Sequence, residues 1–325
     1  MRFSLLLGLC LASLAIATTL RAEDSPIFPA DAKLEQLWND GEFTEGAALG
    51  PDGSIYFSDI ADVKPGRILK YDPHTGKTTV HCPDSQKSNG LVFDAKGRLL
   101  AACGANAGAR AIVEITSDGK VKLLVEKFDG KRFNAPNDLD VHPRGWVYFT
   151  DPFYVGKEPL ELDQMSVYLW KPEDHSVTRV TTDITKPNGV AVSPDGKTLY
   201  VAETNNGKPL LGTSEFAAWR MTLNAFPIKD DGTLGQRRII VDFGKNAGID
   251  GMCVDQAGRL FAAIRNEQRF GIAVFEPASG KELAFVATQE LPTNCCFGSG
   301  DNRHMLYVTA GKGFYRIKTA ANGGK

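Results

Sequence analysis

Oxygen-bearing side chains recur at one fixed place before a series of glycine turns. Counting eight residues back from each turn glycine gives Glu45, Asn89, Asn137, Asn188 and Asp250. Asn and Asp before Gly are common in ordinary turns, so one such residue alone would not indicate a site. Five of them at a constant offset predict a shared role, because turn chemistry does not require a glutamate. A degenerate sixth copy carries Asn294 eight or nine residues before its turn.

These residue types predict a site for a hard cation. Every side chain offers an oxygen, two can be anionic, and none is Cys or His, which is the donor set that calcium prefers. Glu45 and Asp250 together would neutralise a divalent charge. Calcium is therefore the expected ion, with Mg²⁺ and Mn²⁺ as alternatives. Zn²⁺ is less favoured because it prefers nitrogen or sulfur ligands.

The elements that must position these residues form a repeat. A Gly-containing turn is followed each time by a short β-branched or aromatic run, and a short apolar strand precedes it, so each copy predicts a hairpin. The runs after the turns are residues 54–59, 98–102, 146–151, 197–202, 259–263 and 305–309. The first five turn glycines are 44, 48, 51 and 62 residues apart, and a sixth turn follows about 45 residues later.

This spacing predicts an all-β fold, a six-bladed β-propeller with four-stranded antiparallel blades. A β-sandwich or a parallel β-helix is the alternative, but the even spacing argues against both. In a propeller the innermost strand of each blade lines a central channel. The residues at constant offset should therefore converge on one axis.

Composition and the first residues limit the classes of function. With 42% apolar and 23% charged residues the chain is typical of a globular protein. Its net charge of −2 provides no basic surface for phosphate groups, so no nucleic-acid partner is expected. An uncharged stretch, residues 3–20, follows Arg2 and predicts a signal peptide over residues 1–22. The remaining 23–325 are expected to form one domain, exported to the periplasm or secreted, without stable membrane insertion after cleavage. A permanent anchor is the alternative.

Five cysteines remain after the predicted cleavage: Cys82, Cys103, Cys253, Cys295 and Cys296. Their spacing matches no zinc pattern, and most are expected to be buried thiols in strands. An oxidising destination would allow a disulfide. The sequence does not determine their disulfide state.

The site segments also resemble those of a known family. Five segments are similar to motifs of the gluconolactonase, regucalcin (senescence marker protein) and luciferin-regenerating family. They are Phe43-Thr44-Glu45-Gly46, residues 134–138, Pro187-Asn188-Gly189, Ile249-Asp250-Gly251-Met252 and residues 293–298. The resemblance covers nearly all of the chain after the signal. It implies that Glu45, Asn137, Asn188 and Asp250 hold one divalent ion. Ala135 stands where some members have an arginine, which puts sugar-lactone contacts of that kind in question.

A metal ion with open coordination positions can polarise a carbonyl group and acidify a water, and lactone opening needs both. We therefore expect a metal-dependent hydrolase that opens a sugar lactone. Asp250 is the expected general base, although attack by the carboxylate itself stays open. The candidates for substrate contact are Asn89, Asn134, Phe153, Tyr154 and Asn205.

Two other functions remain as alternatives. The same ion and fold could serve a phosphotriesterase or arylesterase, in which the ion would grip a phosphoryl or ester oxygen. The chain could instead be an exported binding propeller without catalysis, because propellers often act as scaffolds. The sequence determines neither the natural substrate nor the oligomeric state.

Overall fold

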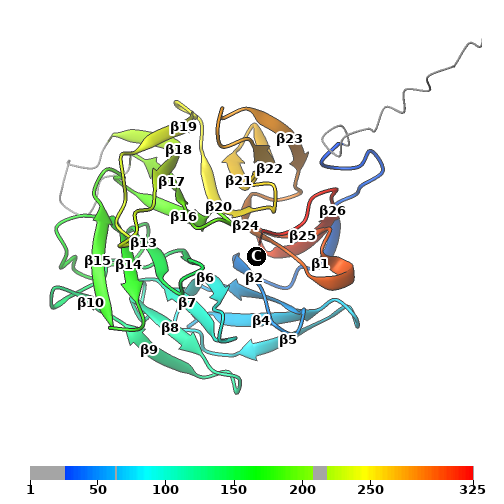
Figure 1. The fold of residues 1–325 in the computed structure, drawn as a ribbon. Helices are drawn as coiled ribbons and strands as arrows, with labels where there is room; N and C mark the ends of the chain where they lie inside the picture. Colours follow the sequence, from blue (N-terminus) through cyan, green and yellow to red (C-terminus); the bar gives the residue numbers. More distant parts are fainter. Residues whose placement is uncertain (1–25, 63, 208–217, 325) are drawn as a thin grey trace, which may run out of the picture.

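The computed structural model describes residues 26–62, 64–207 and 218–324. These residues form six four-stranded antiparallel sheets arranged around one axis (Figure 1). The predicted six-bladed β-propeller is thus confirmed. No helix within these ranges has the length and apolar character needed to cross a membrane. The predicted signal peptide, residues 1–22, lies outside the described residues and stays a prediction.

Blades 1 to 5 each use four strands that are consecutive in the sequence, from the axis outward. Blade 1 comprises β2 (Thr44–Leu49), β3 (Ile55–Asp59), β4 (Arg67–Asp72) and β5 (Lys77–Cys82). Blade 2 comprises β6 (Ser88–Phe93), β7 (Leu99–Cys103), β8 (Ala111–Ile115) and β9 (Val121–Val125). Blade 3 comprises β12 (Leu139–Val141), β13 (Val147–Asp151), β14 (Ser166–Lys171) and β15 (Ser176–Thr181).

Blade 4 comprises β16 (Pro187–Val192), β17 (Thr198–Asn206), β18 (Trp219–Pro227) and β19 (Arg238–Asp242). Blade 5 comprises β20 (Ile249–Val254), β21 (Leu260–Asn266), β22 (Arg269–Phe275) and β23 (Glu282–Ala287). A two-stranded ribbon, β10 (Lys127–Phe128) and β11 (Lys131–Arg132), leads from blade 2 to blade 3.

Blade 6 closes the ring with strands from both ends of the chain. It joins β24 (Pro292–Phe297), β25 (Met305–Ala310) and β26 (Gly313–Lys318) to β1 (Glu35–Trp38), which pairs antiparallel with β26. Thr44 of blade 1 donates its backbone N–H to the Gly311 carbonyl at 2.7 Å, and Thr293 of blade 6 donates its hydroxyl to the Thr44 carbonyl at 2.8 Å. These bonds tie blade 6 to blade 1 beside the axis.

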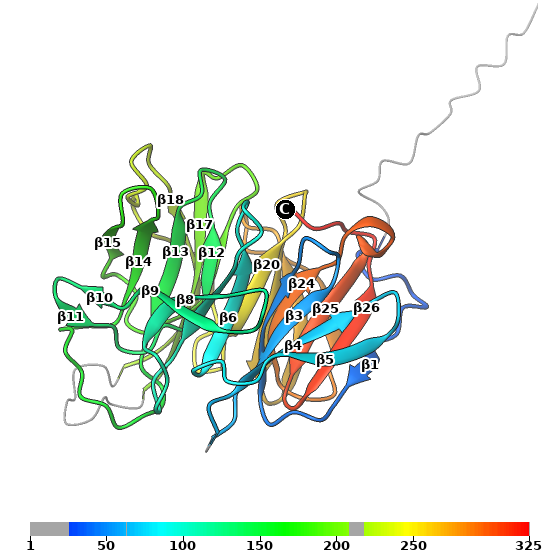
Figure 2. The same cartoon turned by 90° about the horizontal axis from the view of Figure 1, so that it is seen from below.

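The apolar core lies between neighbouring blades, which stand upright around the axis (Figure 2). In blades 1 to 3 the second strands are the most buried, since every residue of β3, β7 and β13 is buried. Aromatic rings connect adjacent blades. Phe57 of blade 1 stacks on Phe314 of blade 6 with ring centroids 4.3 Å apart, a geometry that adds to the free energy gained by burial.

The inner strands approach one another so closely that glycine is required beside the predicted ligand positions. A Cβ atom on Gly46 would lie 2.1 Å from the carbonyl oxygen of Asn89, and one on Gly189 would lie 2.2 Å from that of Asp250. The pairing register also shifts between Glu45 and Ala48, and between Pro187 and Val190. These bulges bend the strand and re-aim its side chains. The recurring oxygen-residue and Gly pair is therefore a packing requirement of the axis.

Buried carboxylates in the second half of second strands hold the backbone that leads into the inner strands. Asp59 accepts the backbone N–H groups of Glu42 and Phe43 at 2.8 and 3.2 Å. Glu203 accepts the N–H of Thr185 at 2.8 Å. Each carboxylate thus fixes the backbone a few residues before a predicted metal ligand, Glu45 in blade 1 and Asn188 in blade 4. We call such a contact a clamp.

Asp151 forms the corresponding clamp in blade 3. Its two carboxylate oxygens accept the N–H groups of Asn134 at 2.9 Å and Ala135 at 2.8 Å, just before Asn137. Asp151 is fully buried, and this burial raises its pKa to about 7 although both hydrogen bonds oppose the shift. The polar contacts of Asp151 thus position the segment that carries Asn137.

We predict that Asp151→Ala lowers the free energy of unfolding by about 3 kcal/mol, because two buried N–H groups lose their acceptor. Urea denaturation followed by circular dichroism measures the change. Asp118→Ala, in an exposed turn, is the control and should leave the midpoint unchanged. A loss of less than about 0.5 kcal/mol for Asp151→Ala, the range of ordinary surface substitutions, would contradict the clamp.

Candidate active site

A cavity of about 880 Å³ lies at the end of the channel where the inner strands begin. Its lining includes all four residues predicted to hold an ion, together with Asn89 from blade 2. The five side chains of the constant-offset set, Glu45, Asn89, Asn137, Asn188 and Asp250, therefore meet at one cavity although they come from five blades. The structure thus brings these residues together, as their constant offset from the turn glycines led us to expect.

The two carboxylates of the cavity are buried and close enough to affect each other. Glu45 is 4% exposed and Asp250 is 7% exposed. Burial raises the pKa of Glu45 well above its ordinary value, and the negative charge of Asp250 raises it further. Burial also raises the pKa of Asp250. Both shifts mean that the site disfavours two anionic carboxylates when no cation is bound.

Arg265 of β21 is a residue of this site that the sequence did not single out. Its Nη1 lies 3.1 Å from Oδ2 of Asp250 and donates to the carbonyl of Pro292 at 3.1 Å. Its guanidinium lies 5.7 Å from the centre of the Phe43 ring. The positive charge of Arg265 lowers the pKa of both Asp250 and Glu45, against the effect of burial.

Tyr154 and Asn188 place further polar groups in the cavity. The Tyr154 hydroxyl donates to the carbonyl of Thr204 at 3.3 Å, and burial raises the pKa of this tyrosine well above its ordinary value. Hydrogen bonding by the Asn188 amide lowers the pKa of Tyr154 and of Asp250, against the effect of burial. The Asn188 amide therefore acts on both the hydroxyl and the carboxylate.

Three of the residues expected to contact substrate lie outside the lining of this cavity. Asn134 donates its side-chain N–H groups to the carbonyls of Asp151 and Gln164, at 3.4 and 3.2 Å. Asn205 is fully buried and donates to the Thr185 hydroxyl at 2.9 Å. Phe153 packs in an apolar cluster with Ala105, Ala135 and Met165. Asn89 and Tyr154 line the cavity, whereas these three side chains lie in its walls, and substrate contact by any of the five stays a prediction.

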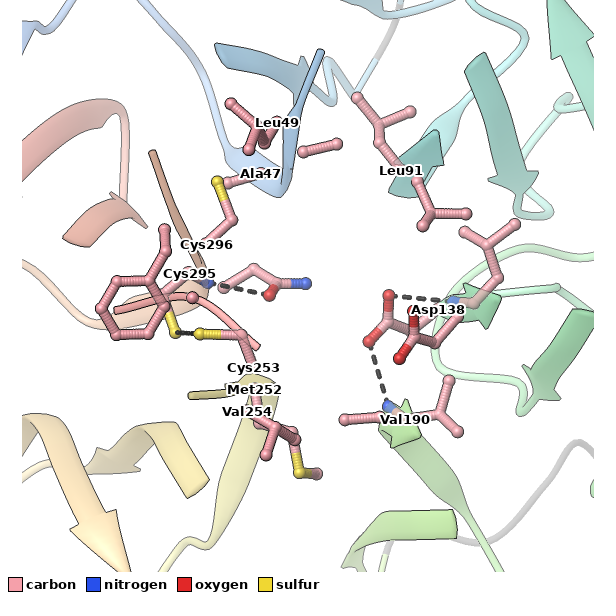
Figure 3. Close-up of a pocket in the computed structure, with 18 of the residues that line it drawn as sticks. Ala47, Leu49, Leu91, Asp138, Val190, Met252, Cys253, Val254, Cys295 and Cys296 are labelled. Carbon is pink, nitrogen blue, oxygen red and sulfur yellow. Dashed lines mark hydrogen bonds between the residues drawn. The ribbon is translucent and has the colours of Figure 1, made fainter. Parts of the chain in front are cut away.

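Asn294, the sixth residue of the series, belongs to a different part of the channel. It lines a second cavity of about 300 Å³, which is bordered by the later residues of the inner strands, as Figure 3 shows. Its side-chain oxygen accepts the N–H of Cys295 at 2.8 Å. Asn294 therefore lines a different cavity from Glu45 and Asp250.

The donors of the larger cavity fit a hard cation. Two buried carboxylates with raised pKa values share the space with one guanidinium. The other charged side chains of the lining are Glu42, Asp62, Lys87 and Glu267, so carboxylates outnumber cationic groups and a bound cation would offset the remaining negative charge. In the described ranges no three His, Cys, Asp or Glu side chains gather as a metal site. Amide oxygens from Asn137 and Asn188 would therefore have to complete the donor set, as calcium sites allow.

Comparison with known proteins places the chain in a family. The family model described as SMP-30/Gluconolactonase/LRE-like region matches residues 43–312. A gluconolactonase of Zymomonas mobilis is 27% identical over 321 residues, which cover 91% of this chain and 84% of the relative. Regucalcin of Gallus gallus is 30% identical over 263 residues, which cover 78% of this chain and 79% of the relative.

Solved structures agree with this assignment. A gluconolactonase from Xanthomonas campestris superposes with a TM-score of 0.76 at 30% sequence identity, covering 90% of this chain and 91% of that one. The matched region contains every residue of the constant-offset set and Arg265. On its sequence, its six blades and the residues gathered at its channel, the chain belongs to the SMP-30/gluconolactonase/LRE-like family.

Proposed function

We propose that the protein is a lactone hydrolase that acts on a sugar-type lactone and depends on a divalent ion, with Ca²⁺ the expected metal. The observation that carries the proposal is the meeting of Glu45, Asn137, Asn188 and Asp250 in one cavity. The family contains gluconolactonases similar to this chain over most of its length, which supports lactone chemistry. Glu45, Asn137, Asn188 and Asp250 would hold the ion.

A divalent ion in this cavity would supply a positive charge that stabilises the oxyanion formed when water attacks a lactone carbonyl. Asp250 then serves as the base that accepts a proton from the attacking water. Arg265 holds Oδ2 of Asp250 at 3.1 Å, which orients the carboxylate and favours its anionic form. Tyr154 and Asn89 border the same space and are the candidates for contact with substrate oxygens.

Burial in the cavity walls strengthens the electrostatic interactions between these groups. Glu45, Asn188 and Asp250 are each less than one-tenth exposed, so the electrostatic interactions between them act in a medium of lower polarity than water. The clamps at Asp59, Asp151 and Glu203 fix the backbone before three of the four predicted ligands. The chain can therefore present its oxygen donors in a fixed arrangement, which is the basis of electrostatic catalysis.

Hydrolysis of D-glucono-δ-lactone, followed by acid release in a pH-stat, tests the proposal. We expect hydrolysis above the spontaneous rate, its loss after treatment with a chelator, and its return when Ca²⁺ is added. Mg²⁺, Mn²⁺ and Zn²⁺, added in turn, compare the metals. Parallel assays with an aryl ester and an aryl phosphotriester separate the lactonase from an esterase or phosphotriesterase. Absence of hydrolysis with all substrates and metals would favour a binding propeller and refute the proposal.

Asp250→Asn should reduce kcat at least 100-fold, because an amide cannot accept the proton from water at neutral pH. Circular dichroism should show an unchanged fold, since the substitution keeps the size of the side chain. Asp140→Asn, on an inner strand but at the second cavity, is the matched control and should retain most of the activity. Wild-type kcat in Asp250→Asn would show that another group is the base.

Arg265→Gln should bind Ca²⁺ about ten times more tightly than the wild type, because removal of a positive charge beside Asp250 lowers the repulsion of a divalent ion. Isothermal titration calorimetry measures this affinity without any substrate. Arg269→Gln is the control, since Arg269 pairs with Glu282 on the exposed part of the same hairpin. An equal or lower affinity in Arg265→Gln would mean that Arg265 does not oppose the cation.

A further inference from the structure

The second cavity of the channel brings together two thiols from neighbouring blades. Cys253 lies on β20 of blade 5 and Cys295 on β24 of blade 6, and both belong to inner strands. Their sulfur atoms are 3.5 Å apart, and Figure 3 shows the two side chains pointing toward each other. Cys253 is partly exposed to the cavity, whereas Cys295 is 2% exposed.

We propose that Cys253 and Cys295 form a disulfide that cross-links the inner strands of blades 5 and 6. A disulfide has sulfur atoms about 2.05 Å apart, so the pair must close by about 1.5 Å. Small rotations of the two side chains can provide this movement, because the strands that carry them are already adjacent at the axis.

The other cysteines have contacts of a different kind. Cys82 donates to the carbonyl of Asp84 at 3.2 Å, and Cys103 donates to the carbonyl of Ser85 at 3.4 Å. Cys296 packs on the opposite side of β24, against the cluster of blades 1 and 6 that includes Ala47. The contact between Cys253 and Cys295 therefore selects one pair among the five cysteines.

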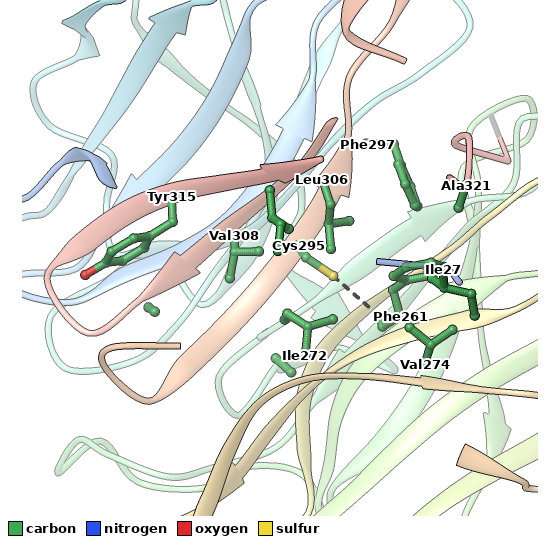
Figure 4. Packing of buried hydrophobic residues seen from close by; sticks show 13 residues of the cluster. Ile27, Phe261, Ile272, Val274, Cys295, Phe297, Leu306, Val308, Tyr315 and Ala321 are labelled. Atoms are coloured by element: carbon green, nitrogen blue, oxygen red, sulfur yellow. Dashed lines mark hydrogen bonds between the residues drawn. The ribbon is translucent and has the colours of Figure 1, made fainter. Parts of the chain in front are cut away.

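The surroundings of Cys295 hold it in place for this bond. Its sulfur also contacts the carbonyl of Phe261 at 3.4 Å, within the apolar cluster of blades 5 and 6 that Figure 4 shows. Cys253 packs against the edge of the same cluster and faces the cavity. Cys253 is thus the accessible partner that meets an oxidant first, and Cys295 is the buried partner that resolves the intermediate.

The oxidation is a thiol–disulfide exchange with a small disulfide such as oxidised glutathione. The Cys253 thiolate attacks one sulfur of the reagent, which forms a mixed disulfide and releases one thiol. Cys295 then attacks the Cys253 sulfur and displaces the second thiol. Two protein S–H bonds are broken and one S–S bond forms, while two electrons and two protons pass to the reagent, which is reduced to two thiols.

The exchange is expected to be slow. The hydrogen bond with Cys295 and burial both raise the pKa of Cys253 well above its ordinary value, which keeps the thiolate form scarce. The test therefore uses long incubation of the full chain in a buffer of oxidised and reduced glutathione, followed by acid quenching.

Tryptic peptide mapping by mass spectrometry identifies the bond. Cys253 falls in the peptide 246–259, and Cys295 and Cys296 share the peptide 282–303. We expect these two peptides to be linked, with the loss of two hydrogen atoms, in the wild type and in Cys296→Ser. The link should be absent in Cys253→Ser and Cys295→Ser.

Cys296→Ser is the decisive background because it removes the adjacent thiol and keeps the proposed pair. A missing link in that variant, or glutathione adducts without a link, would overturn the proposal even if the Cys253 or Cys295 variants failed to fold. As a second readout, oxidation should raise the Tm of the wild type by about 5 °C, because the cross-link restricts the unfolded chain. Cys253→Ser should show no such rise.

Discussion

The close approach of the inner strands at the propeller axis is the constraint on which the other features of this protein depend. Gly46 and Gly189 lie so near the backbone of the next blade that no side chain fits there. Local shifts of register accompany both glycines and turn the preceding side chains, Glu45 and Asn188, into the channel. The same packing that closes the ring therefore gathers oxygen atoms at one end of it.

Burying two carboxylates close together costs free energy, because desolvation and mutual repulsion both disfavour their anionic forms. Glu45 and Asp250 are both almost fully buried, and each responds with a raised pKa. Arg265 offsets one of the two negative charges, so the site keeps an affinity for either a proton or a cation. This balance explains why amide side chains occupy the other ring positions. Further carboxylates would add repulsion, whereas Asn137 and Asn188 add oxygen donors without charge.

Most of the fold and the central residues of the site could be predicted from the sequence because both repeat. Turn glycines at regular spacing indicated six blades, and residues at a constant offset from them now line one cavity. The closure of blade 6 by β1 had no such signal, since β1 precedes the first repeat. Asn134 and Asn205 were chosen because they lie near the ends of channel-facing segments, a signal that does not determine the direction of a side chain. Both are held by hydrogen bonds in the walls.

The second strands explain why Arg265 could not be predicted from the same repeat. In blade 1, Asp59 of the second strand lies opposite Thr44 of the inner strand, and in blade 4 Glu203 lies opposite Pro187. An acidic residue therefore stands opposite the residue just before each predicted metal ligand, Glu45 and Asn188. Blade 5 has Ile264 opposite Ile249 at this place, and the clamp is lost. The next residue, Arg265, instead reaches Asp250 itself. The Arg265 N–H and the Thr204 hydroxyl hold the backbone before Asp250 through the Gly248 and Ile249 carbonyls, and the ion pair orients its carboxylate. The orientation of this carboxylate is therefore sensitive to any other charge that enters the cavity.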